Sequence, residues 1–137
     1  MDITENILSK ALGCRELARK DCWQLLQGWR EVYARDLFSQ IGKWKDGDFD
    51  WHLFSAGHYP CEAGAKALEC YRERNTSGDI LIFVFDPEEK CFRCEFTERP
   101  EFHDEDVIVT PPDYEWTMVF THEQSWGYGP YFARRER

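Results

Sequence analysis

The sequence predicts a single α+β domain over residues 1–137. A mainly antiparallel sheet of four to five strands would carry two N-terminal helices and one further helix, all packed on one face. Apolar residues recur at helical intervals in the first third of the chain, and later segments alternate apolar and polar residues as strands do. The chain has 137 residues, 42% of them hydrophobic, which suits one compact domain with its own core.

Three helices are expected: residues 3–12, a longer segment from Asp21 to about Gly42, and residues 61–74. The first two open with an acidic residue followed three positions later by Glu or Gln, the spacing of a capping box. The third is rich in Gly and Ala, so its backbone can approach a sheet closely.

The strongest strand pattern covers residues 80–85, which are apolar at every position. Such a run favours a central strand that is buried on both faces. Residues 91–97 alternate, with Phe92, Cys94 and Phe96 on one side, and a tight turn over residues 86–90 precedes them. The remaining expected strands are residues 50–55 and 115–121, with two weaker ones at 107–109 and 131–133.

The net charge of −9 limits the classes of partner. A chain this acidic repels phosphate groups, so double-stranded nucleic acid and anionic membranes are not expected partners. Residues 86–106, here called the acidic segment, hold nine acidic and three basic side chains. This segment is either a solvated edge of the domain or a binding face for a basic protein.

The cysteines bear on the cellular compartment. The N-terminus lacks the pattern of a signal peptide, and the longest apolar run is too short to span a bilayer, so we expect a cytoplasmic protein whose six cysteines are mostly free thiols. The even count leaves a disulfide framework as the alternative. Cys91 and Cys94 have CxxC spacing but fall in a strand, where they face opposite sides. We therefore expect no metal here, an inert Cys94 and a more accessible Cys91.

One set of side chains could support catalysis. His122 and Glu123 follow a predicted strand, while His52 and His58 lie in and after another. If these strand ends are adjacent, the four residues could bind a metal or transfer protons. No familiar metal-binding spacing is present, so structural or solvent-facing histidines are the alternative.

Residues 122–132 form the most unusual stretch, because aromatic side chains alternate there with glycines and a proline. Trp126, Tyr128 and Tyr131 supply the large contact areas that are typical of binding hot spots. The alternative is that these rings fold onto the core and clamp the C-terminus.

Four stretches, DWHLFS, YPCEAGAKAL, YEWTMVFTHE and GPYFARRE, resemble a family of small bacterial proteins of unknown function. That family combines a WxxFS strand with a C-terminal WTxxFTHE…GPYF block. The resemblance covers residues 50–133. It implies a bacterial, cytoplasmic protein and carries no activity and no catalytic residues.

The leading hypothesis is therefore a non-enzymatic, acidic interaction module without a cofactor, comparable to immunity proteins or antitoxins that bind a basic protein. Glu101, Asp104 and Glu105 would steer the encounter, and the three aromatic side chains of residues 122–132 would anchor the complex. Two alternatives remain open: a small metal-assisted hydrolase that uses the His/Glu set, and a small-ligand sensor with an aromatic-lined pocket.

Overall fold

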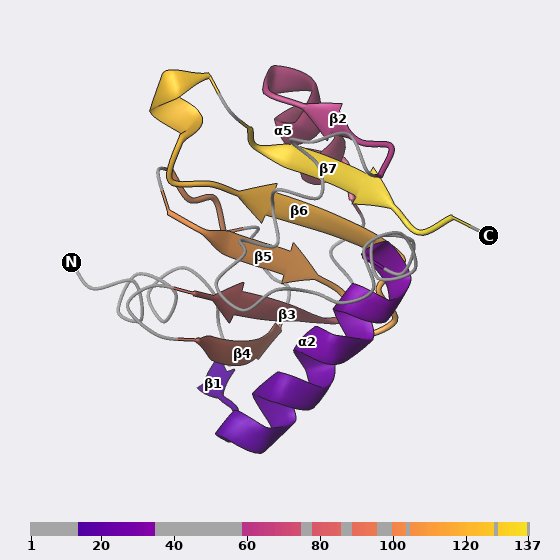
Figure 1. The fold of residues 1–137 in the computed structure, drawn as a ribbon, viewed down its shortest axis with the longest axis vertical. Helices are drawn as coiled ribbons and strands as arrows, with labels where there is room; N and C mark the ends of the chain where they lie inside the picture. The colour runs from indigo at the N-terminus through magenta and orange to yellow at the C-terminus, as the bar shows by residue number, and fades with distance from the viewer. Residues whose placement is uncertain are drawn as a thin grey trace.

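A computed structural model describes residues 14–34, 59–74, 78–85, 89–95, 100–103, 105–127 and 129–136 (Figure 1). Two α-helices occur in these ranges, α2 (Arg19–Tyr33) and α5 (Ala65–Arg72). A short 3-10 helix, η1, covers Gln124–Trp126. The strands are β1 (Arg15–Glu16), β2 (Glu62–Ala63), β3 (Asp79–Val84), β4 (Lys90–Glu95), β5 (Val107–Thr110), β6 (Trp116–Phe120) and β7 (Tyr131–Arg134).

All seven strands form one antiparallel sheet in the order β1-β4-β3-β5-β6-β7-β2. The expected sheet of four to five strands is therefore wrong. The two additional strands, β1 and β2, lie at the edges and contain only two residues each. Two residues are too few to show an alternation of apolar and polar side chains, so the sequence contains no strand pattern at these positions.

Strand β3 is confirmed as an interior strand, because it pairs with β4 on one side and with β5 on the other. Its residues from Ile80 to Val84 are all buried, which requires cover on both faces of the sheet. Strand β5 is buried along its whole length in the same way. On β4, Phe92 and Cys94 share one face as expected.

The two helices cover opposite faces of the sheet, which corrects the expectation of helices on one face. Helix α2 packs with Leu81, Phe83 and Ile108, whereas α5 packs with the residues between them that point the other way, such as Ile82 and Val109. In Figure 1, α2 crosses the β4 and β3 side of the sheet, and α5 lies beside β7 and β2. Strands that are apolar on both faces need cover on both.

The observed helix starts also differ from the expected ones. Helix α2 begins at Arg19 after Ala18, and no side-chain cap is made, so Asp21 lies inside the first turn instead of capping it. Its negative charge there is favourable next to the helix N-terminus. Residues 61–64 precede α5 and include β2, which pairs with β7. The expected helix 3–12 and strand 50–55 lie outside the described residues.

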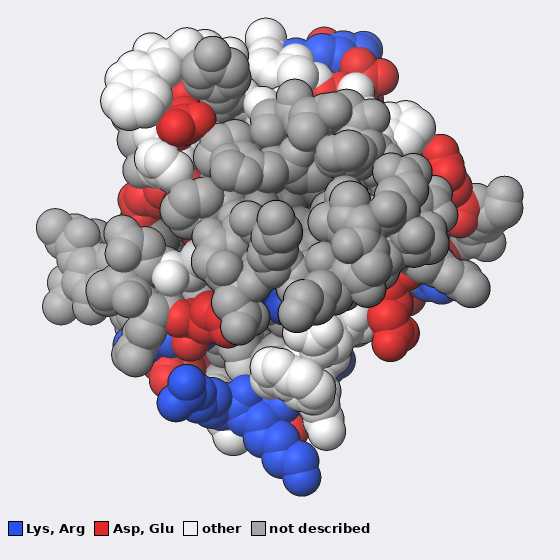
Figure 2. Space-filling model, viewed as in Figure 1, with Lys and Arg blue, Asp and Glu red and all other residues white. Residues whose placement is uncertain are grey.

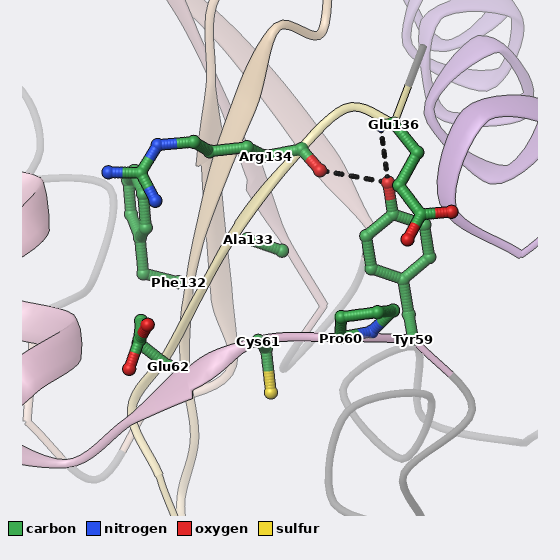
Figure 3. Close-up of a pocket in the computed structure, with 8 residues that line it drawn as sticks. All are labelled: Tyr59, Pro60, Cys61, Glu62, Phe132, Ala133, Arg134 and Glu136. Carbon is green, nitrogen blue, oxygen red and sulfur yellow. Dashed lines mark hydrogen bonds between the residues drawn. The ribbon is translucent and has the colours of Figure 1, made fainter.

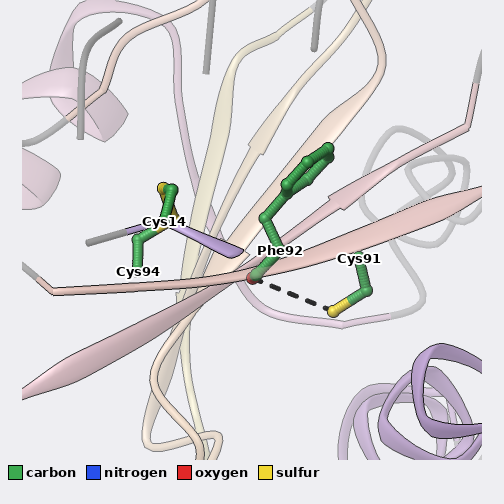
Figure 4. The surroundings of a disulfide bond; sticks show 4 residues. All are labelled: Cys14, Cys91, Phe92 and Cys94. Atoms are coloured by element: carbon green, nitrogen blue, oxygen red, sulfur yellow. Dashed lines mark hydrogen bonds between the residues drawn. A yellow bond between two sulfur atoms is a disulfide. The ribbon is translucent and has the colours of Figure 1, made fainter. Parts of the chain in front are cut away.

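The thiols also depart from expectation. Cys14 and Cys94 form a disulfide bond, while Cys22, Cys61, Cys70 and Cys91 are free (Figure 4). Cys91 is fully buried, so the expectation that it is the accessible member of the CxxC pair is wrong. The reason is that the Cys91 face of β4 is covered by α2.

Candidate functional site

The turn that follows β6 is a candidate contact region, because it carries the exposed Trp126 on a hydrogen-bonded backbone. Residues 121–127, here called the Trp126 turn, are folded by local hydrogen bonds. The amide of Thr121 donates to Gln124 Oε1 at 3.1 Å, and the amide of Glu123 donates to the Thr121 hydroxyl at 3.2 Å. Gly127 closes η1 with φ 90°, a left-handed conformation that favours glycine. These bonds fix the backbone that carries Trp126.

An Asp–His pair connects this turn to the neighbouring strand. The backbone amide of His122 donates to Asp106 Oδ1 at 2.9 Å, and the ring Nδ1 lies 3.0 and 2.9 Å from the two carboxylate oxygens. The Asp106 carboxylate is buried, so this pairing satisfies it and orients the imidazole ring. The other ring nitrogen, Nε2, lies 3.7 Å from Glu123 Oε1.

Asp106 was not among the residues selected from the sequence as part of a His cluster. The signal for it lies in the sheet register, since Val107 of β5 is paired with Phe120 of β6. Residues that precede β5 therefore lie beside residues that follow β6. The proximity of Asp106 and His122 could be predicted only from the β5–β6 pairing.

A second contact joins the acidic segment to the Trp126 turn. The ring of His103 lies 3.4 Å from Gln124 Nε2 and 3.4 Å from the hydroxyl oxygen of Ser125. The described end of the acidic segment, residues 100–103 and 105–106, thus runs alongside the turn. The acidic segment and residues 122–132, which the sequence indicated as separate candidate contact regions, are therefore adjacent in space.

The predicted contact residues differ in exposure. The side chain of Trp126 is 71% exposed, whereas Tyr131 lies in β7 and is only 6% exposed. Glu105 is half-buried. Glu101 forms a two-bond ion pair with Arg72, at 2.9 and 2.7 Å, which raises the pKa of the guanidinium through hydrogen bonding. Asp104 and Tyr128 lie outside the described residues.

The predicted catalytic set is only partly visible. His122 and Glu123 lie at the end of β6 as expected, while His52 and His58 lie outside the described residues. Within the described ranges, no group of three or more His, Cys, Asp and Glu side chains could hold a metal ion.

A pocket of about 260 Å³ lies at the β7–β2 edge (Figure 3). The hydroxyl of Tyr59 donates to the carbonyl oxygen of Arg134 and accepts from the amide of Glu136, each at 2.8 Å. The Arg134 guanidinium lies over the Phe132 ring, 5.1 Å from its centre. These polar contacts hold the C-terminal strand in place, so the pocket has a structural use.

The chain matches, over residues 1–132, a family described as a domain of unknown function, DUF4275. The chain belongs to this family. The match confirms the expected relation to proteins of unknown function, and it begins at residue 1, well before the resemblance at residue 50. No curated protein and no solved structure matches the chain.

Membership of DUF4275 assigns no chemistry, so function must be argued from geometry. Across the described part of this DUF4275 protein, no helix is long and apolar enough to cross a bilayer. Figure 2 shows acidic side chains at several separate places on the viewed face, and a concentration of basic ones where α2 begins. Among the described residues in this view, the acidic side chains stand at separate places.

Proposed function

We propose that this protein is a non-enzymatic interaction module of the bacterial cytoplasm, in which the Trp126 turn docks a basic protein partner. One observation carries the proposal: a largely exposed Trp126 stands on a hydrogen-bonded turn beside the acidic segment. The mode of action would be that of immunity proteins or antitoxins, in which carboxylates cover a basic functional site.

The energetic argument rests on the fixed backbone of the turn. A Trp side chain offers a large contact area, and Trp is among the residues that most often act as binding hot spots. Because the turn is already folded, less conformational entropy is lost when a partner binds. Truncating such an anchor typically costs about 2 kcal/mol or more of binding free energy.

The neighbouring carboxylates would act on the rate of association. Exposed charges steer encounters over distances comparable to the Debye length, about 8 Å at physiological ionic strength. Glu105 is half-buried and adjoins Asp106, whose carboxylate contacts His122 of the turn, and Asp104 precedes it in sequence. The test reverses the charges at positions 104 and 105 and leaves the ion pair of Glu101 with Arg72 intact.

The experiment uses two exposed tryptophans as a matched pair. Trp126 is 71% exposed and Trp23, on α2, is 59% exposed. Wild type, Trp126→Ala and Trp23→Ala are immobilised and exposed to bacterial extract, and bound proteins are quantified by mass spectrometry. We expect a basic protein that binds wild type and Trp23→Ala, and that is lost with Trp126→Ala.

The recovered protein is then purified for binding kinetics. Trp126→Ala should mainly raise the dissociation rate, and Asp104→Lys with Glu105→Lys should slow association and flatten its salt dependence. Equal recovery by wild type and Trp126→Ala would overturn the proposal. An association rate that is unchanged by both charge reversals would also overturn it.

The cytoplasmic location has its own test. Reducing compartments keep most thiols reduced, so Cys14 and Cys94 should be alkylated when cells are lysed directly into a thiol-blocking reagent. A fully oxidised pair in freshly blocked cells would contradict the cytoplasmic assignment.

A metal-assisted hydrolase is the second candidate, favoured by the carboxylate that orients His122 through Nδ1. Together with His52, His58 and Glu123, this imidazole would complete a metal site. Elemental analysis of protein purified without a His-tag decides between the two functions. One tightly bound transition metal per chain, lost in His122→Ala, would favour the hydrolase.

A further inference from the structure

Four cysteines lie in or beside strand β4, in two pairs on opposite faces of the sheet. Cys94 is bonded to Cys14 on the α5 face, and Cys91 faces Cys22 of α2 on the other. Figure 4 shows the disulfide and the Cys91 sulfur on different sides of the β4 ribbon. The pleat separates the pairs, so neither Cys91 nor Cys22 can attack the existing disulfide directly.

The path of the chain brings Cys22 back over Cys91. Strand β1 runs antiparallel to β4, and the amide of Leu17 then donates to the Cys91 carbonyl oxygen at 2.9 Å. Helix α2 begins two residues later, which places Cys22 at the end of its first turn. Cys22 and Cys91 belong to one buried cluster beneath α2, and the Cys91 thiol donates to Phe92 O at 3.9 Å.

A pocket of about 400 Å³ leads to Cys22. Cys22 lines this pocket, whereas Cys91 is fully buried behind it. The other lining residues are Glu16, Leu17, Arg19, Trp23, Glu89 and Lys90. Lys90 is paired with Glu16 at 3.9 Å, so Arg19 is the basic residue of this lining that can attract a ligand with carboxylate groups, and Glu89 opposes it.

The two thiols are chemically unequal. Donation from Cys91 lowers the pKa of Cys22, against the opposing effects of burial, Glu89 and Glu16. The same hydrogen bond and burial raise the pKa of Cys91. Thiolates, and not thiols, attack disulfides. Cys22 lines the pocket and Cys91 is fully buried, so Cys22 is the attacking sulfur and Cys91 the second one, in agreement with the directions of their pKa shifts.

We propose that Cys22 and Cys91 form a reversible thiol–disulfide site that reacts with small disulfides of the glutathione type. The Cys22 thiolate attacks one sulfur of the small disulfide, forms a mixed disulfide and releases one thiolate. Cys91 then loses its proton, attacks the Cys22 sulfur and displaces the second thiolate. Two protein thiols become one disulfide, and one small disulfide becomes two thiols.

The product would join the start of α2 to β4 by a covalent bond. The site is separate from the Trp126 turn, which follows β6, a strand three positions away from β4 in the sheet order. Its failure would therefore leave the proposed interaction function untouched.

The test compares wild type with Cys91→Ser after incubation with oxidised glutathione, using intact mass and peptide mapping. Wild type should lose two of its four free thiols and carry a Cys22–Cys91 disulfide without an adduct. Cys91→Ser has no second thiol, so Cys22 should retain one glutathionyl group. Cys61→Ser, which removes a half-buried thiol elsewhere, should behave as wild type.

Several outcomes would overturn the proposal. These are a stable adduct on Cys22 of wild type, an adduct only on Cys61, or no reaction at Cys22 in either protein. If Cys91→Ser does not fold, as judged by circular dichroism, the mapped Cys22–Cys91 linkage in wild type decides alone. Its presence supports the site and its absence refutes it.

Discussion

Both faces of the sheet contain packed aromatic rings, but hydrogen bonds from aromatic side chains are more numerous on the α2 face of the described residues. On the α2 face, buried aromatic side chains make specific hydrogen bonds: Trp29 Nε1 donates to the Thr117 hydroxyl at 2.9 Å, and the Tyr33 hydroxyl donates to the Tyr114 carbonyl at 2.7 Å. On the α5 face, rings pack on rings, and the Tyr71 hydroxyl donates one buried hydrogen bond, to the Pro100 carbonyl oxygen at 2.7 Å. Tyr71 lies 5.9 Å from Phe120, edge to face, measured between ring centres.

The difference matters because hydrogen bonds between buried groups fix one position, whereas packed rings tolerate changes of shape. A buried polar atom that loses its partner costs about 1–3 kcal/mol, while volume-conserving apolar exchanges usually cost less than about 1.5 kcal/mol. The α2 face should therefore be the less tolerant of conservative substitution. The α5 face should depend more on its volume and its disulfide.

The largest effect is expected for Trp29→Ala, because Trp29 is fully buried. The free energy of unfolding should fall by about 3–5 kcal/mol, and Phe120→Ala on the other face should cost a similar amount. Conservative substitutions should have different costs on the two faces. Trp29→Phe leaves the buried Thr117 hydroxyl without its indole partner, so it should cost more than Phe120→Leu, as measured by urea denaturation. Equal losses would remove the proposed contrast.

Removing the disulfide should have the next largest effect. Cys14→Ala with Cys94→Ala opens a link between positions that lie 80 residues apart and should lower stability by about 2–4 kcal/mol under oxidising conditions. Dithiothreitol should lower the stability of wild type toward that of the variant and leave the stability of the variant unchanged. A wild type that is insensitive to dithiothreitol would show that the α5 face does not depend on this link.

A smaller effect is expected where α2 approaches the chain before β6. A Cβ at Gly28 would lie 2.6 Å from the Tyr114 hydroxyl oxygen, whose group donates to Leu25 O. Gly→Ala in a helix normally stabilises by about 1 kcal/mol, but this overlap should reverse the sign and cost about 1–3 kcal/mol. In a Tyr114→Ala background, Gly28→Ala should become neutral or stabilising in denaturation experiments. A cost that persists there would place the strain elsewhere.

The sequence predicted the strands whose patterns are long, and it failed where contacts depend on pairing. An unbroken apolar run predicted strand β3, and the alternation of Trp116, Met118 and Phe120 predicted β6. The opposite placement of the two helices depends on which strands lie adjacent, which local periodicity does not encode. The same holds for the Cys14–Cys94 bond, which requires the β1–β4 pairing.

The candidate site shows the same limit. The exposure of Trp126 agrees with a contact role, but Tyr131 from the same stretch lies in a core strand. Their difference follows from strand β7, which begins at Tyr131 and turns that ring toward α2. The Asp106–His122 pair was not predicted because the two residues come from different stretches of the chain, joined only by the β5–β6 register.

The smallest expected effect concerns Tyr33 and depends on pH. Tyr33→Phe removes a hydrogen bond on the α2 face and should cost about 0.5–1.5 kcal/mol at neutral pH. Burial, followed by the nearby Tyr59, raises the pKa of Tyr33 in the folded protein above its unfolded value of 10.0. The neutral phenol is favoured on folding, so its contribution is complete below about pH 10 and decreases as the pH rises further.

The stabilities of the two proteins, measured by urea denaturation from about pH 7 to 11, should therefore converge at the alkaline end. The other tyrosines titrate in both proteins and cancel in the difference. A gap that stays constant across this range would mean that the Tyr33 hydroxyl ionises as readily in the folded chain as in the unfolded one, which would contradict a tightly held hydrogen bond on the α2 face.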